Sequence, residues 1–402
     1  MGRMKVGRLI PKRKRIRRAA SVRAAQLLGY VHRKERLRQG NQIETLRTGA
    51  EAYPAMLEAI AQAKRFVHLA TYIIKDDRCG RRFLEALVER AQAGVCVRLS
   101  YDGLGSYELP QAFVQELRAG GVQVAEFHPI APWRKYYGVS QRDHMKILVV
   151  DGEVGFTGGI NIGDDYAPLA DGGGGWFDMH ARVRGPIVAD LNQLFARTWW
   201  RATREHPESA SEAPAALPLP HMLASVIDNF GMRNRSRKRG AYLHAIRAAQ
   251  SRIGIMNAYF IPDIRLRRAL RAAARRGVLV QVIVPEVNDV SIVMHASRHL
   301  YPRLLRGGVR IFEWPERMMH AKTAVIDGKW STIGSYNIDR RSMFHNLEAS
   351  VVVADEPFGV RMQKLFDDEL MKSREVTLAE CLERPKLERA KQWFCYLWRY
   401  WL

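Results

Sequence analysis

Two stretches of the chain carry the same reactive side chains in the pattern H-x-K-x4-D-x6-G-[GS]-x-N. The first copy is His144, Lys146, Asp151 and Asn161, and the second is His320, Lys322, Asp327 and Asn337. Imidazoles can act as nucleophiles and as acids or bases near neutral pH, while lysine and asparagine donate hydrogen bonds to negatively charged oxygens. A doubled set of these groups predicts chemistry on an anionic substrate.

Alternation along a strand places His144 and Lys146 on the same face, and Asp151 followed by Gly152 is a hairpin turn signal. We include Asp151 and Asp327 among the catalytic candidates because they belong to the pattern. An aspartate before glycine is, however, more often a turn residue, so we expect a structural role for both. The glycines before Asn161 and Asn337 let backbone approach a ligand closely.

The repeat extends beyond these stretches. Gly120-Gly121-Val122 corresponds to Gly307-Gly308-Val309, and Tyr72 corresponds to Tyr259. In the first half the pattern predicts a helix over 83–93, a strand over 95–101 and a helix over 111–119. The pattern therefore predicts that each half consists of alternating helices and strands that end in a hairpin, which indicates an α/β duplication.

Composition shifts suggest five segments. We expect a basic N-terminal arm at 1–40, a first domain at 41–208, a linker at 209–238, a second domain at 239–372 and a charged, aromatic tail at 373–402. The arm contains fourteen Lys or Arg and one acid, so it supplies +13 of the net charge of +23. A charge of this sign favours an anionic partner, either a phospholipid membrane surface or nucleic acid.

The doubled pattern resembles the HKD motif of the phospholipase D superfamily, and the likeness covers residues 41–372. The resemblance implies an α/β fold of two duplicated phospholipase D-like domains, packed about a pseudo-twofold axis with one shared active site. It also implies a two-step phosphodiester exchange through a covalent phosphohistidine. In that mechanism His144 is the nucleophile, and His320 is first the acid and then the base.

A nucleophilic histidine needs its second ring nitrogen held in place. Glu348 lies where the superfamily has an orienting acid, and Asp178 is its counterpart in the first half, although ordinary surface carboxylates are the alternative. The lysines and asparagines of the pattern would stabilise the charge on the phosphoryl oxygens as Mg²⁺ does elsewhere. We therefore expect no metal and no cofactor.

Stretches at 50–56, 257–262 and 334–339 resemble bacterial cardiolipin synthases of the short type without transmembrane helices. This likeness implies transfer of a phosphatidyl group to phosphatidylglycerol as acceptor, from phosphatidylglycerol or phosphatidylethanolamine as donor. The alternatives are a phospholipase D hydrolase, a phosphodiesterase or nuclease acting on nucleic acid, and a catalytically silent lipid-binding scaffold. Two complete motifs argue against the last.

Two aromatic segments bear on the membrane. From Pro129 to His144 is fifteen residues, but from Pro315 to His320 is five, and the extra residues include Trp133. The tail ends in WFCYLWRYWL, which we interpret as an interfacial anchor, with a terminal helix docked on the protein as the alternative. Without an apolar run long enough for a signal peptide or a transmembrane helix, we expect a peripheral protein on the cytoplasmic face of the bacterial inner membrane.

Overall fold

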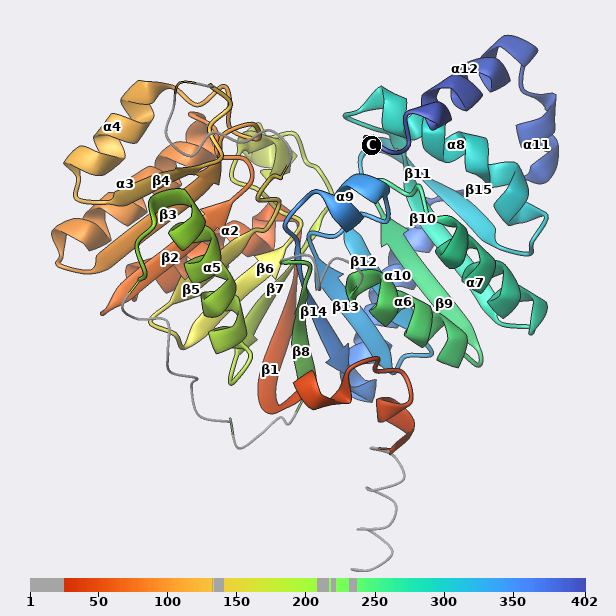
Figure 1. Cartoon of the computed structure of the whole chain (residues 1–402), viewed down its shortest axis with the longest axis horizontal. Coiled ribbons are helices and arrows are strands. Elements are labelled where there is room, and N and C mark those ends of the chain that lie inside the picture. The colour runs from red at the N-terminus through yellow and green to blue at the C-terminus, as the bar shows by residue number, and fades with distance from the viewer. Residues whose placement is uncertain (1–24, 132, 134–140, 208–216, 218–221, 231–236) are drawn as a thin grey trace, which may run out of the picture.

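The computed structural model describes residues 25–131, 133, 141–207, 217, 222–230 and 237–402 (Figure 1). The strands of the first half are β1 (Arg38–Arg47), β2 (Phe66–Thr71), β3 (Cys96–Asp102), β4 (Gln123–Phe127), β5 (Ile147–Val150), β6 (Val154–Gly158) and β7 (Met179–Arg184). Its helices are α2 (Thr48–Ala61), α3 (Arg78–Gln92), α4 (Gln111–Ala119) and α5 (Val188–Thr203). The helix and strand positions predicted over 83–119 are confirmed, with shifts at some ends.

The second half repeats this order. Its strands are β8 (Met222–Asp228), β9 (Arg252–Asn257), β10 (Leu279–Val287), β11 (Arg310–Met318), β12 (Lys322–Ile326), β13 (Trp330–Gly334), β14 (Ala349–Ala354) and β15 (Arg374–Val376). Its helices are α6 (Arg237–Ala248), α7 (Ile264–Arg275), α8 (Ser291–Leu305), α9 (Arg340–Phe344), α10 (Glu356–Lys372), α11 (Leu378–Glu383) and α12 (Lys386–Leu397).

All these strands form one sheet that passes through both halves. The first half has the order β4-β3-β2-β5-β6-β7-β1, and the second continues from β1 with β8-β14-β13-β12-β9-β10-β11-β15. Read outward from the β1–β8 junction, the two orders match strand for strand until β15. The predicted fold of two duplicated α/β domains related by a pseudo-twofold axis is confirmed.

Three clusters of buried apolar side chains pack the helices against the sheet. One lies under the helices of the first half and one under those of the second half. The third joins the halves, because it contains Met145 and Phe177 from the first half together with Met319 and Leu347 from the second. This shared core fixes the two halves against each other at the ends of the motif strands.

The hairpins that follow the motif strands have the turns expected from their sequence. Asp151 and Gly152 have φ values of 54° and 72°, and Asp327 and Gly328 have 53° and 60°. Two consecutive left-handed residues give the tight turn that matches strand twist, and Asp followed by Gly is well suited to it.

Three of the predicted segment boundaries are wrong in part. The arm at 1–40 includes Tyr30 and Val31, which are buried in the core of the second half, and Arg38, where β1 begins; residues 1–24 lie outside the described residues. The linker at 209–238 contains β8. The residues of this strand are mostly buried, and it pairs with β14 on one side and with β1 on the other. The tail at 373–402 packs on the second half through Cys381 and Cys395.

Within the described residues, no helix combines the length and the apolar character needed to cross a bilayer.

Candidate active site

The side chains of both motifs emerge at one end of the central strands. His144 and His320 precede β5 and β12, which begin at Ile147 and Lys322. Asn161 follows the end of the antiparallel strand β6, and the same holds for the second copy after β13. Because neighbouring antiparallel strands begin and end at the same edge, the local fold brings the histidine and the asparagine of each motif together.

Backbone hydrogen bonds then join each motif to the other half. The N–H of His144 donates to the carbonyl of Leu347 at 2.9 Å, and the N–H of His320 donates to the carbonyl of Phe177 at 2.6 Å. These carbonyls belong to the residues just before Glu348 and Asp178. The pseudo-twofold axis therefore delivers the carboxylate of one half to the histidine of the other.

Each imidazole consequently has a buried carboxylate from the opposite half. His144 Nδ1 lies 3.1 Å from Glu348, and His320 Nδ1 lies 2.7 Å from Asp178. Both carboxylates are fully buried. The structure thus brings the two predicted orienting acids to the two motif histidines in a crossed arrangement, and because Nδ1 of each ring faces its acid, Nε2 is the nitrogen left for a substrate.

The two histidine–acid pairs differ in their surroundings. Ser335 donates a short hydrogen bond from its hydroxyl to Glu348. The equivalent residue beside Asp178 is Gly159, where a Cβ atom would lie 2.2 Å from the Asp178 carboxylate. Glycine is therefore required for the close approach of Asp178, whereas the longer Glu348 leaves space for a hydroxyl.

A further buried cation lies near Glu348. Lys238 is 1% exposed, and its Nζ lies 5.2 Å from the ring centroid of Tyr336. Burial lowers the pKa of Lys238 to about 7, although the charges of Glu348 and Asp228 raise it. Burial also opposes ionisation of Glu348, but its interaction and hydrogen bond with the imidazole of His144, together with the charges of Lys238 and Lys146, lower its pKa overall. Glu348 is thus held as a carboxylate.

Burial sets the protonation of the motif histidines. It lowers the pKa of His144 to about 4, against the opposing charge of Glu348. Burial lowers the pKa of His320 as well, assisted by the charge of Lys322 and opposed by Asp178. Without substrate, both imidazoles are therefore neutral at neutral pH, which is the form that can act as a nucleophile.

The side chains of the two motif lysines are buried next to the histidines and do not line the pocket. Lys146 Nζ donates to the carbonyl of His144 at 2.8 Å and lies 5.1 Å from the ring centroid of Tyr72. Lys322 donates to the carbonyl of His320, and its Nζ lies 3.8 Å from Asp178. Burial lowers their pKa values to about 7 and about 8, respectively. The positive charge is thus concentrated beneath the imidazoles.

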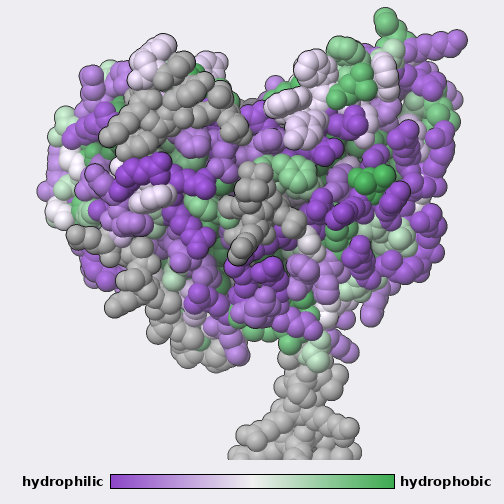
Figure 2. Space-filling view, viewed as in Figure 1, coloured by the Kyte–Doolittle hydropathy of each residue, from purple (hydrophilic) through white to green (hydrophobic). Residues whose placement is uncertain are grey.

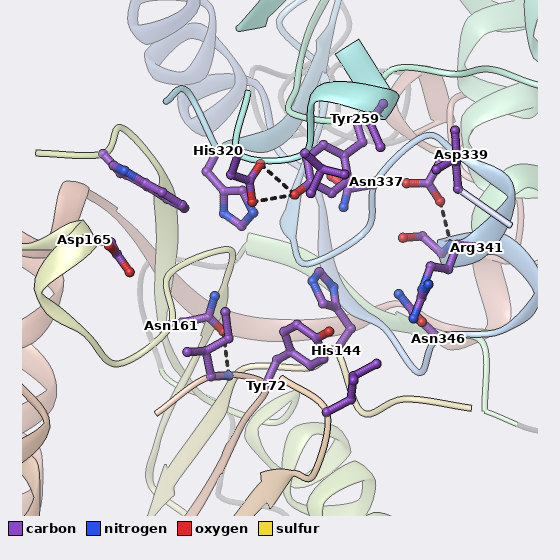
Figure 3. A pocket seen from close by; sticks show the side chains of 18 of the residues that line it. Tyr72, His144, Asn161, Asp165, Tyr259, His320, Asn337, Asp339, Arg341 and Asn346 are labelled. Carbon is purple, nitrogen blue, oxygen red and sulfur yellow. Dashed lines mark hydrogen bonds between the residues drawn. The ribbon is translucent and has the colours of Figure 1, made fainter. Parts of the chain in front are cut away.

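One pocket of about 500 Å³ collects these groups between the halves (Figure 3). Both motif histidines and both motif asparagines line it. Asn161 Nδ2 donates to the hydroxyl of Tyr166 at 2.8 Å, and that hydroxyl lies 3.2 Å from His320 Nδ1. Among the described residues, no cluster of three or more His, Cys, Asp or Glu side chains has the arrangement of a metal site.

Several lining residues were missed by sequence reasoning. They are Tyr72, Tyr166, Trp176, Tyr259, Asp339 and Arg341. Tyr72 lies edge-on to His144 at 4.8 Å between ring centroids, and its counterpart Tyr259 lies edge-on to His320 at 6.2 Å. The repeat itself pointed to this tyrosine pair. Arg341 carried no such signal, because the equivalent residue in the first half is an aspartate, Asp165, which also lines the pocket.

The structure does not bring Asp151 and Asp327 into the pocket. Each lies at the far end of its strand, where the Asp151 carboxylate accepts backbone N–H bonds from Lys64, Arg65 and Phe66 at 2.7–2.8 Å. The Asp327 carboxylate accepts backbone N–H bonds in the same way at the start of β9. This position favours the structural role expected for both, since neither carboxylate lies among the residues that line the pocket between the halves.

Comparison with known proteins identifies the family. Residues 56–199 and 242–370 match the family model described as "Cardiolipin synthase, PLD-like domain". Cardiolipin synthase A of Pseudomonas fluorescens is 35% identical over 374 residues, which cover 92% of this chain and 76% of that protein. A probable cardiolipin synthase of Bacillus subtilis is 31% identical and covers 88% of this chain and 71% of its own length.

The fold agrees with this result. The crystal structure of a phosphatidylserine synthase from Haemophilus influenzae matches 95% of this chain and 100% of its own chain, with a TM-score of 0.72 at 15% identity. The chain therefore belongs to the cardiolipin synthase-like phosphatidyltransferases of the phospholipase D superfamily.

Proposed function

We propose that this protein makes cardiolipin by transferring a phosphatidyl group to phosphatidylglycerol through a covalent phosphohistidine. The donor is a second phosphatidylglycerol or phosphatidylethanolamine. The observation that carries the proposal is the pair of imidazoles lining one pocket, each held at Nδ1 by a buried carboxylate of the opposite half. The names of the relatives support the choice of lipid.

In the first step, Nε2 of neutral His144 attacks the phosphorus of the donor. The bond from phosphorus to the headgroup oxygen breaks, and protonated His320 gives its proton to that oxygen, so that glycerol or ethanolamine leaves. The anionic phosphate of the bound donor favours the charged form of His320, which is otherwise neutral because of its burial. Before the proton is transferred, Asp178 stabilises the protonated imidazole of His320.

In the second step, the roles of His320 are reversed. Neutral His320 removes the proton from a hydroxyl of phosphatidylglycerol, and the resulting oxygen attacks the phosphorus held on His144. The bond between phosphorus and His144 Nε2 breaks, which releases cardiolipin and restores the neutral imidazole. Water in place of this alcohol would give phosphatidic acid instead.

The other groups of the motif would stabilise the five-coordinate phosphorus. Asn161 and Asn337 line the pocket and can donate to the phosphoryl oxygens, while Lys146 and Lys322 supply positive charge from just beneath it. Arg341 is a further cation on the second-half wall. We place its guanidinium against the phosphate of the acceptor, since Arg suits this geometry.

The working location that fits this reaction is the cytoplasmic face of the bacterial inner membrane, with the protein bound peripherally.

The proposal is tested by incubating the purified protein with labelled phosphatidylglycerol, with and without phosphatidylethanolamine, and identifying the products by mass. We expect cardiolipin together with free glycerol, and free ethanolamine as well if phosphatidylethanolamine is a donor. A double variant with His144→Ala and His320→Ala controls for a contaminating enzyme. Phosphatidic acid as the sole product would indicate a hydrolase, and cleavage of single-stranded DNA without lipid turnover would indicate a nuclease.

A further inference from the structure

The C-terminal helix α12 uses one narrow face to pack on the second half. Gln392 and Cys395 are buried on that face. The ring of Tyr396 stacks on His299 of α8 at 4.7 Å between centroids. The helix is thus anchored on α8 at the upper right of Figure 1, and the C-terminus that follows it lies on the side of the second half that faces the first.

The opposite face of α12 and the residues that follow it are exposed and apolar. The exposed side chains there are Leu387, Trp393, Phe394, Leu397, Trp398, Tyr400 and Trp401. Their fractional exposure ranges from 46% for Tyr400 to 84% for Leu387. Single exposed apolar residues are common, but an exposed aromatic stripe at helical spacing marks an interaction surface. Figure 2 shows green and pale atoms over this helix at the upper right.

This aromatic face, defined as the exposed side chains from Leu387 to Trp401, runs directly to the active-site pocket. Trp401 and Leu402 line the same pocket as the two motif histidines. The carbonyl of Leu402 accepts a hydrogen bond from the N–H of Arg341 at 2.9 Å, and Arg341 also lines the pocket. The segment after α12 is therefore part of the pocket wall as well as of the exposed surface.

Basic side chains flank the face. Arg399 lies 4.6 Å from the ring centroid of Tyr396, and Arg340 of α9 lies 5.1 Å from that of Tyr400. Two guanidinium groups thus lie beside the aromatic side chains at the C-terminal end of the helix. An aromatic stripe bordered by arginine fits the headgroup layer of an anionic bilayer, where Trp and Tyr rings insert and guanidinium groups meet phosphate.

We propose that the aromatic face of α12 inserts into the surface of an anionic phospholipid bilayer and opens the pocket toward that surface. A phospholipid could then reach the histidines along Trp401 without leaving the membrane. This inference rests on the proposed function, because it takes the substrate to be a membrane phospholipid.

The test uses the full chain with substitutions confined to the exposed side chains of α12 that lie outside the pocket lining. The test variant combines Leu397→Gln with Trp398→Gln, and a second variant adds Trp393→Gln and Phe394→Gln. The matched control is Val360→Gln with Met371→Gln on α10, which removes two apolar side chains that are 58% and 80% exposed. Thermal unfolding should change little in all three, because every replaced side chain is about half exposed or more.

Binding is measured by sedimentation with vesicles of phosphatidylglycerol and phosphatidylcholine at low and high salt. We expect the test variants to bind about tenfold more weakly or worse at both salt concentrations, since insertion of apolar area is insensitive to screening. Turnover of a short-chain soluble phosphatidylglycerol should stay at the wild-type rate. The control should bind vesicles like the wild type.

Wild-type vesicle binding by the four-residue variant would overturn the inference. So would a change from dimer to monomer with unchanged vesicle binding, which would make the face a contact between two copies of this chain. A wild-type protein that binds vesicles through α12 but makes no cardiolipin would instead refute the proposed function alone.

Discussion

The substitution Asp151→Asn distinguishes a structural from a catalytic role for the aspartate of the motif. Asparagine has nearly the same shape and tolerates the left-handed φ of 54°, so the backbone of the turn is not strained. One carboxylate oxygen accepts from the N–H groups of Arg65 and Phe66, and the other accepts from that of Lys64. An amide retains the first oxygen but presents an NH₂ group to Lys64.

The expected cost follows from these three bonds. One N–H loses its acceptor, which costs ~1–3 kcal/mol, and two charge-assisted bonds become neutral, which costs ~1 kcal/mol each. Because Lys64 is partly exposed and water can replace its bond, we expect a total loss of about 2–4 kcal/mol in the free energy of unfolding. That is a large fraction of the stability of an ordinary domain.

Urea unfolding followed by tryptophan fluorescence measures this loss, and phosphatidyl transfer per folded molecule measures the chemistry. We expect lower stability with a rate per folded molecule within a few-fold of the wild type. The parallel variant Asp151→Ala should be less stable still, since it removes every acceptor. If Asp151→Asn unfolds like the wild type and yet is inactive, our structural interpretation of this aspartate fails.

Three further outcomes are expected. His144→Ala and His320→Ala should each reduce transfer by at least ~10³-fold with normal folding, since each removes one of two essential groups; a rate near wild type in either would refute the shared site. Rates measured as kcat/KM should fall as pH rises through about 7 to 8, because the two buried motif lysines, with pKa values of about 7 and about 8, lose their charge there; a profile flat to about pH 10, where an ordinary lysine titrates, would contradict this. Incubation with EDTA followed by desalting should leave transfer intact, and loss of activity restored by one specific metal would overturn the assignment of charge stabilisation to lysine and asparagine.

The repeat made most of the site predictable from sequence. Identical spacing of histidine, lysine and asparagine in two copies identified four of the pocket-lining residues and both lysines beneath it. Glu348 and Asp178 were also named, but the sequence could not show that each acid serves the histidine of the opposite half. That crossing depends on the backbone bonds from His144 and His320 to the other half, which join residues far apart in the chain.

Local composition misled the interpretation of one segment and described another only in part. Proline-rich sequence predicted a linker over 209–238, whereas the short apolar run Met222–Asp228 forms a central strand once both its neighbours are present. The aromatic content of the tail favoured an interfacial anchor, with a docked terminal helix as the alternative. Gln392 and Cys395 are three residues apart, which is the spacing of one helical face. In the structure this face of α12 packs on the second half, while the aromatic side chains on the other face are exposed.

The covalent step on His144 is central to the proposed reaction, and a quenched reaction can detect it. Wild-type protein is mixed with phosphatidylglycerol labelled in the phosphate, stopped within milliseconds, and the labelled peptide is identified by mass spectrometry under mildly basic conditions. We expect the phosphatidyl group on His144 in the wild type and no adduct in His144→Ala. In His320→Ala the adduct should form slowly at the same residue and then persist, because the base for the second step is missing. An adduct on His320 that persists in His144→Ala would reverse the two roles, and the absence of any adduct during active turnover would contradict the two-step mechanism.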